Sequence, residues 1–203
     1  MVHSAEFGTH SNGAGRGSEA DSRRPVHIEK PAPTGREAFF GPEEIIVSKT
    51  DSNGRIAYAN EVFCRVAGYT ENEVIGQPHS FIRHPEMPRC IFKLMWDTIQ
   101  RGEEIFAYVM NMTRNGDHYW AFAHVTPTFD EAGAISGYHS NRRCPDRSHV
   151  AQMSQLYRDL VAIERRHNSK VEGLNASLAM LHQMLNDKSL SYEQFIFQMQ
   201  EVA

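Results

Sequence analysis

Short runs of alternating apolar and polar residues begin at position 45. Residues 45–48 and 55–59 each predict a strand. The Asp-Ser-Asn-Gly segment at 51–54 lies between them and has a strong hairpin signature. Two short helices are predicted next, over residues 60–68 and 70–76. The first can be capped by an asparagine, and the second opens on a Thr-Glu-Asn-Glu capping box.

A longer helix and three strands are predicted after these elements. Apolar residues at helical spacing indicate a helix of about three turns from residue 90 to Gly102. The strands are expected at residues 104–113, 118–128 and 134–142. This order predicts an α+β fold, with short helices on one face of a five-stranded antiparallel sheet and a long helix at the C-terminus. Such a domain has a natural concave pocket between its sheet and its helices.

The two ends of the chain differ from this central pattern. Residues 1–40 are rich in Gly, Ser, His, Pro and charge, which predicts a disordered tail ahead of a folded domain at 41–145. Over residues 146–187, apolar positions recur at alternating steps of three and four, which predicts an amphipathic helix. It either forms a coiled coil with another chain or folds back on the domain. Residues 188–203 are expected to form a short terminal helix and tail.

Composition and charge narrow the classes of protein further. The formal net charge of −4 gives no electrostatic case for binding nucleic acid. No run approaches the roughly 18 apolar residues of a membrane span, and the polar N-terminus does not resemble a secretory signal. The three cysteines lack the spacing of a metal site or of a haem attachment, so we expect reduced thiols and a cytoplasmic chain.

The strongest candidate for binding chemistry is the loop at residues 83–88. Its sequence, Arg-His-Pro-Glu-Met-Pro, carries three charged or titratable side chains on a backbone made rigid by two prolines. Core packing does not require such a loop, so it suggests contact with a ligand that is not protein. The alternative is that Arg83 and His84 only pin the loop by hydrogen bonds.

Several motifs give residues 45–143 a family resemblance. The segment resembles a PAS domain, and it is most similar to the PAS domain of aerotaxis receptors, the flavin-binding energy sensors of bacterial chemotaxis. The Arg-His-Pro-acidic-Met-Pro loop is the most specific match. The matching stretches are Ala59-Asn60, Gly68-Tyr69-Thr70, Gly76-Gln77-Pro78-His79, Arg83-His84-Pro85, Met87-Pro88, Met95-Trp96, Asn115 to Trp120, and Ile135-Ser136-Gly137-Tyr138.

The resemblance implies a non-covalently bound FAD with Arg83, His84 and Glu86 near it. A flavin needs apolar walls for its ring and cationic partners for its diphosphate. The remaining expected site residues are Phe92, Trp96 and Trp120 as ring walls, Asn60 and Asn111 as polar partners, and His124. The chain departs from the family pattern at Ser80, Glu86, Ile105 and His124.

Other interpretations of the same residues stay open from sequence alone. Phe92 and Trp96 have the spacing of ordinary core residues. Only one of Tyr119 and Trp120 can face the pocket, since neighbours on a strand point to opposite faces. Haem b is the alternative cofactor, because histidines including His124 lie in the candidate region. A PAS domain without cofactor, used only for dimerisation, is the remaining alternative.

The expected activity is sensing rather than catalysis. The chain has no P-loop, no Gly-x-Ser-x-Gly, no His-Glu-x-x-His and no Rossmann fingerprint, so we expect no enzyme. The expected function is a redox or oxygen sensor that signals through its C-terminal helix. The expected partners are a second copy of the chain and a signalling protein, such as a chemotaxis receptor or a component of a kinase pathway.

Overall fold

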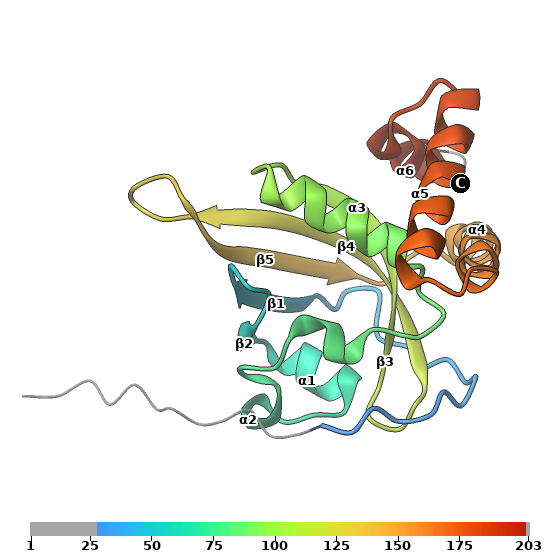
Figure 1. Ribbon diagram of the computed structural model, residues 1–203. Coiled ribbons are helices and arrows are strands. Elements are labelled where there is room, and N and C mark those ends of the chain that lie inside the picture. Colours follow the sequence, from blue (N-terminus) through green and yellow to red (C-terminus); the bar gives the residue numbers. More distant parts are fainter. Residues whose placement is uncertain (1–27, 202–203) are drawn as a thin grey trace, which may run out of the picture.

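A five-stranded antiparallel sheet organises residues 28–201, the part of the chain that the computed structural model describes (Figure 1). The strand order is β2-β1-β5-β4-β3. Every neighbouring pair within it is antiparallel, as the sequence predicted. The strands are β1 (Ile46–Asp51), β2 (Ile56–Ala59), β3 (Ile105–Met112), β4 (His118–Phe129) and β5 (Ile135–Arg143).

The turns form where the sequence placed them. In the β1–β2 turn, the Asp51 carboxylate accepts backbone N–H bonds from Asn53 and Arg55 at 2.9 and 2.8 Å. Gly54 and Gly116 both have positive φ, 76° and 86°, which only glycine adopts without strain. These two turns fix the strand register, and the register decides which side chains face the helices.

Four short helices cover one face of the sheet. They are α1 (Glu61–Ala67), α2 (Glu71–Val74), the 3₁₀ helix η1 (His79–Ile82) and α3 (Arg89–Gln100). The helix starts follow the predicted caps: the Asn60 side chain accepts from the Phe63 N–H, and the Thr70 capping box is formed. The fold class predicted from sequence is therefore confirmed on this side of the sheet.

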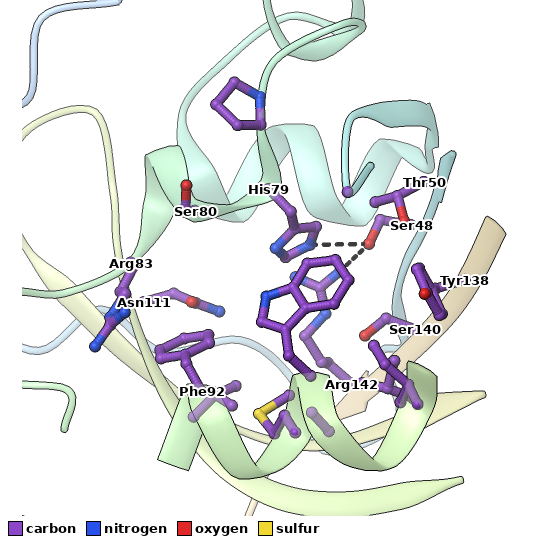
Figure 2. A pocket seen from close by; sticks show the side chains of 18 of the residues that line it. Ser48, Thr50, His79, Ser80, Arg83, Phe92, Asn111, Tyr138, Ser140 and Arg142 are labelled. Atoms are coloured by element: carbon purple, nitrogen blue, oxygen red, sulfur yellow. Dashed lines mark hydrogen bonds between the residues drawn. The ribbon is translucent and has the colours of Figure 1, made fainter. Parts of the chain in front are cut away.

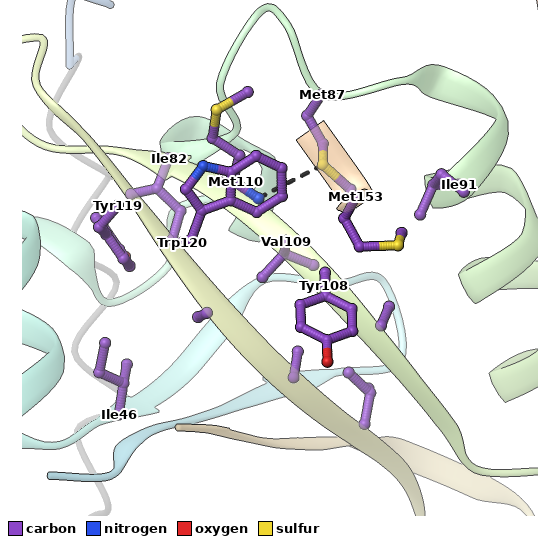
Figure 3. Close-up of a cluster of buried hydrophobic side chains, with 14 of the residues drawn as sticks. Ile46, Ile82, Met87, Ile91, Tyr108, Val109, Met110, Tyr119, Trp120 and Met153 are labelled. Atoms are coloured by element: carbon purple, nitrogen blue, oxygen red, sulfur yellow. Dashed lines mark hydrogen bonds between the residues drawn. The ribbon is translucent and has the colours of Figure 1, made fainter. Parts of the chain in front are cut away.

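The opposite face of β3 and β4 is covered by the C-terminal helices (Figures 1 and 3). Tyr108, Met110 and Trp120 point to this face. The Tyr157 hydroxyl of α4 (Arg147–Arg165) donates to the Tyr108 carbonyl at 2.6 Å, and the Tyr157 ring stacks on Trp120 with 5.7 Å between centroids. Each such buried apolar side chain contributes about 1.5–3 kcal/mol. Since Met153 also lies fully buried there, α4 is firmly docked.

The C-terminal region differs from the single helix expected over 146–187. It consists of α4 (Arg147–Arg165), α5 (Lys170–Asp187) and α6 (Tyr192–Glu201). Ser169 starts α5 by accepting the Glu172 N–H, and α5 folds back on α4. At their crossing, a Cβ on Gly173 would lie 2.4 Å from the Glu164 carbonyl oxygen. Gly173 therefore permits the close contact between α4 and α5.

Residues 28–40 also differ from the expectation of a disordered tail at 1–40. They lie along the β3–β4 hairpin, where the Thr34 N–H donates to the Gly116 carbonyl at 2.9 Å and the His118 N–H donates to the Arg36 carbonyl at 2.9 Å. A Cβ on Gly116 would lie 2.1 Å from the Ala32 carbonyl oxygen, so the contact is intimate. The expectation for residues 1–27 falls outside the described residues.

Candidate functional site

A cavity of about 180 Å³ lies between the inner face of the sheet and helices η1 and α3 (Figure 2). Strands β1, β3, β4 and β5 supply its floor, and α3 supplies its roof. Its main lining side chains are Ser48, His79, Arg83, Phe92, Met95, Trp96, Ile99, Val109, Asn111, Ala123, Val125, Tyr138, Ser140 and Arg142.

One wall of the cavity is aromatic. Phe92 and Trp96 project from the same face of α3, since they are four residues apart. Trp96 meets Tyr138 of β5 edge to face, with 5.4 Å between ring centroids. A Cβ on Gly54 would lie 2.9 Å from the Trp96 ring, so the β1–β2 turn needs glycine to accommodate the indole.

A second part of the lining is a buried polar relay (Figure 2). Arg142 Nη2 donates to Ser48 Oγ, and Ser48 Oγ lies 3.1 Å from His79 Nε2. Burial, reinforced by the positive charge of Arg142, lowers the pKa of His79 to about 3. His79 is therefore neutral at ordinary pH, and its Nε2 shares a hydrogen bond with the Ser48 hydroxyl.

Arg142 is the most unusual side chain of the site. It is 1% exposed, and burial lowers its pKa. Its Nε and Nη1 are buried with no hydrogen-bond partner, and no carboxylate of residues 28–201 forms an ion pair with it. Its guanidinium carbon also lies 5.2 Å from the centroid of the Phe63 ring. A buried cation left in this state favours an acceptor-rich ligand in the cavity.

Arg83 lies across the cavity from Ser48 and Tyr138 (Figure 2). Its Nη2 donates to the Met87 carbonyl at 3.0 Å, and its guanidinium lies over the Phe92 ring at 4.1 Å. Burial is the main cause that lowers the pKa of Arg83 to about 10. The residue thus pins the loop and also lines the cavity, and its contact with a ligand stays a prediction.

Four of the nine residues expected from sequence line the cavity together: Arg83, Phe92, Trp96 and Asn111. They come from the loop, from α3 and from β3, so only the fold brings them together.

Two of the other expected residues lie on the far face of the sheet. Trp120 stacks on Tyr157 of α4, and His124 bonds Glu104 at 2.6 Å and stacks on Phe106. Strand alternation places both of them away from the cavity, and it is Tyr119 that faces inward.

The remaining three expected residues also lie outside the cavity lining. Asn60 bonds backbone groups of β1, because its side chain spans between Val47 and Ile45. His84 accepts the Glu86 N–H at 3.1 Å, and burial lowers its pKa to about 4. Glu86 pairs with Arg165 of α4 at 2.6 Å. These residues therefore hold the loop and the elements around the site.

Sequence reasoning missed Arg142, Ser48 and Tyr138. Arg142 lies in a polar run, Ser-Asn-Arg-Arg, that shows no alternation of hydrophobicity. Arg142 could have been identified from its position four residues after Tyr138, because residues separated by an even number lie on the same face of a strand.

The five-stranded sheet and its internal cavity define a PAS-type domain, and a family model described as the PAS fold matches residues 56–141. Residues 56–141 are therefore similar to the PAS fold. It is related to the aerotaxis receptor of Escherichia coli (strain K12), with 39% identity over 132 residues that make up 65% of this chain and 26% of the relative.

Two other relatives are named as regulatory or biofilm dispersion proteins. The biofilm dispersion protein BdlA of Pseudomonas aeruginosa is 26% identical over 132 residues, 64% of this chain and 29% of that protein. The nitrogen fixation regulatory protein of Klebsiella pneumoniae is 28% identical over 99 residues, 49% of this chain and 20% of that protein. The chain spans between a fifth and a third of the length of these relatives.

Among solved structures, a light-oxygen-voltage domain studied with a flavin analogue has a TM-score of 0.49 and 20% identity. The match covers 55% of this chain and 83% of the light-oxygen-voltage domain chain. Within residues 28–201, no helix is long and apolar enough to cross a membrane. The same residues contain no cluster of three or more His, Cys, Asp or Glu side chains that could hold a metal ion.

Proposed function

We propose that this chain is a redox or oxygen sensor whose PAS cavity binds FAD, and that it signals to a protein partner through its C-terminal helices. The observation that carries the proposal is Arg142, a buried guanidinium with two unpartnered N–H groups on an aromatic cavity. A flavin has the matching chemistry, an apolar ring system with carbonyl and nitrogen acceptors on one edge. The relationship to an aerotaxis receptor supports the same assignment.

The side chains fit such a ring in kind. Phe92, Trp96 and Tyr138 offer aromatic surface, while Arg142 and Asn111 offer hydrogen-bond partners. Cofactor pockets usually have volumes of roughly 300–1,000 Å³, so a cavity of about 180 Å³ must widen to admit the ring. Trp96 is the wall that we expect to move, because it is partly exposed and lies at the Gly54 turn next to Tyr138.

The chain's own residues supply the electrostatics of sensing. A flavin, when bound, supplies a reversible redox couple whose charge changes on reduction. Arg142 keeps a fixed positive charge beside the cavity, and the neutral His79 is joined to it through Ser48. Added negative charge in the cavity would strengthen the pull on Arg142 and lengthen or break its bond to Ser48.

Glu164 provides a route from the cavity to the C-terminal helices. Its Oε1 accepts the Cys90 N–H at the start of α3 and the Ser177 hydroxyl of α5, each at 3.1 Å. Its Oε2 pairs with Arg89 at 2.8 Å. Phe92 and Trp96 of the cavity wall belong to α3 as well. A ligand that shifts α3 would therefore change the contacts that Glu164 makes with α3 and α5. We propose no catalytic step, and we propose the cytoplasm as the location.

Absorption of the purified full-length chain tests the cofactor. Bound flavin gives the two flavin bands and haem gives a Soret band, and release by denaturation followed by chromatography separates FAD from FMN. His79 is the cavity-lining histidine, and it already bonds Ser48, which makes haem the weaker candidate. Protein that stays colourless after FAD and haem are each offered would refute the cofactor and favour the dimerisation module.

Signalling is tested separately from the cofactor. We expect oxidised and reduced protein to differ in protease sensitivity or hydrogen exchange over α4 and α5, and a homodimer to be visible by light scattering. Identical protection in the two redox states would refute the proposed output, even if flavin is bound.

A further inference from the structure

A second, larger cavity of about 340 Å³ lies next to the candidate cofactor cavity. Its walls come from three separate segments: residues 28–40, the 83–89 loop, and the C-terminal half of α4. Arg83 lines both cavities, so the two meet at this side chain. We call the second cavity the basic cleft and define it by Lys30, Arg83, Arg89, Glu164 and Arg165.

Positive charge dominates the basic cleft. Four cationic side chains line it, against the single carboxylate of Glu164. Arg89 pairs with Glu164 at 2.8 Å, and Arg165 pairs with Glu86 at 2.6 Å. No carboxylate of residues 28–201 forms an ion pair with Lys30 or Arg83. Two cations thus face one cavity without a compensating anion.

The two unpaired cations also repel one another. Partial burial and the charge of Arg83 lower the pKa of Lys30. Burial, with a smaller contribution from Arg89, lowers the pKa of Arg83. An anion placed between the two side chains would relieve a cost that the free protein carries.

We propose that the basic cleft binds a phosphate or diphosphate group. Arginine forks and lysine ammonium groups are the usual phosphate partners, and the start of α3 at Arg89 adds the positive end of a 12-residue helix. The volume of the cleft exceeds what a single small anion needs, which favours a diphosphate. Its three walls mean that the anion would tie the loop and residues 28–40 to α4.

Two sources can supply this chemistry. The diphosphate of FAD is one, because Arg83 connects the cleft to the cavity for the ring; this source rests on the proposed function. A free phosphate compound is the other, and it does not depend on a flavin. An experiment with FMN, FAD and inorganic pyrophosphate separates them, because FMN lacks the second phosphate.

The test uses the full chain as wild type, Lys30→Gln and the control Lys49→Gln. Lys49 is an exposed lysine on β1, outside the lining of either cavity, so its loss makes the same charge change elsewhere. Affinities for FMN and FAD are measured by fluorescence titration of cofactor-free protein. Pyrophosphate binding is measured by calorimetry, with and without FAD.

If FAD supplies the phosphate, Lys30→Gln weakens FAD about tenfold and leaves FMN within twofold, and FAD blocks pyrophosphate binding. If a free compound supplies it, Lys30→Gln weakens pyrophosphate about tenfold in FAD-loaded protein too, while FAD and FMN bind alike. The proposal is overturned if Lys30→Gln and Lys49→Gln have the same effect on FAD and on pyrophosphate. Pyrophosphate binding without any flavin binding would instead refute the proposed flavin cofactor and support the proposed phosphate site in the basic cleft.

Discussion

Replacement of Arg142 by methionine separates stability from function in this chain. Arg142 has no carboxylate partner among the described residues, and two of its guanidinium nitrogens have no hydrogen-bond acceptor. Methionine is unbranched and shorter than arginine, carries no charge and is flexible enough to fill irregular space. We therefore expect Arg142→Met to raise the stability of cofactor-free protein and to weaken flavin binding.

The expected size follows from three opposing contributions. Burying an unpaired ion costs several kcal/mol. The bond from Arg142 to Ser48 returns about 1.5–3 kcal/mol, and the contact with Phe63 returns about 0.5–2 kcal/mol. The two contacts together return about 2–5 kcal/mol, so a burial cost of about 5 kcal/mol leaves a net gain of up to about 3 kcal/mol on substitution. With a urea m-value of roughly 2 kcal/mol/M, the midpoint should rise by up to about 1.5 M.

Flavin should shift this difference in stability back towards the wild type. Losing one charge-assisted hydrogen bond to the ligand costs about 1.5–3 kcal/mol, so the Kd rises roughly 10- to 150-fold. Ligand at 100 times the wild-type Kd stabilises wild type by about 2.7 kcal/mol and the variant far less. The redox midpoint of any flavin that still binds should also fall, because the positive charge that favours the reduced form is gone.

Urea unfolding with and without FAD measures both effects. Arg143→Met is the matched control, because Arg143 is the next residue on β5 and its side chain is exposed. The control should change the urea midpoint little in either condition. The reasoning would be refuted by cofactor-free Arg142→Met that unfolds at lower urea than wild type, since Arg142 would then stabilise the free protein.

Two further predictions follow from the packing and the buried histidine. Gly173→Ala should destabilise the chain by about 1–3 kcal/mol in urea unfolding, because the added Cβ would lie 2.4 Å from the Glu164 carbonyl oxygen. The control Asn175→Ala, at an exposed position of the same helix, should be neutral or slightly stabilising. Equal effects of the two substitutions would contradict the close helix crossing. The pKa of His79 in the folded protein is about 3, below its ordinary value of 6.5. Its contribution to stability is therefore complete above pH 6.5 and is lost as the pH falls towards 3. At pH 4 the free energy of unfolding should be lower by about 3 kcal/mol. His79→Gln should flatten the pH dependence of the unfolding free energy by that amount between pH 6.5 and 4, and an unchanged slope would show that the histidine accepts a proton in the folded state.

Local sequence signals predicted most of the domain because its elements depend on neighbours in the chain. The Asp-Ser-Asn-Gly turn, the Thr70 capping box and the glycine at 68 each supply their own hydrogen bonds or φ angle. Burial of both sheet faces removed the alternation that would have assigned Tyr119 and Trp120, since both are buried. The direction of those two side chains could come only from the register with β3.

The signals that failed were those that depend on distant partners. The three-four spacing continues through the polar positions Glu164 and His167 to Val171, so it predicted one helix where Ser169 and Gly173 allow two. Residues 28–40 are polar, and their order comes from backbone bonds to the Gly116 turn that composition does not reveal. The burial of Arg142 could not be predicted, because the helices that cover it lie more than 40 residues earlier in the chain.

The two cavities suggest why the C-terminal helices are held so tightly to the PAS domain. The Arg-His-Pro-Glu-Met-Pro loop supplies Arg83 to both cavities and Glu86 to the ion pair with Arg165 of α4. Immediately after the loop, Arg89 meets Glu164, whose other oxygen reaches α5 through Ser177. A ligand that draws on Arg83 therefore acts on the same short segment that anchors both helices. If the cavity ring and the cleft phosphate belong to one FAD molecule, binding and redox change would bear on the α4–α5 hairpin from two sides of a single loop.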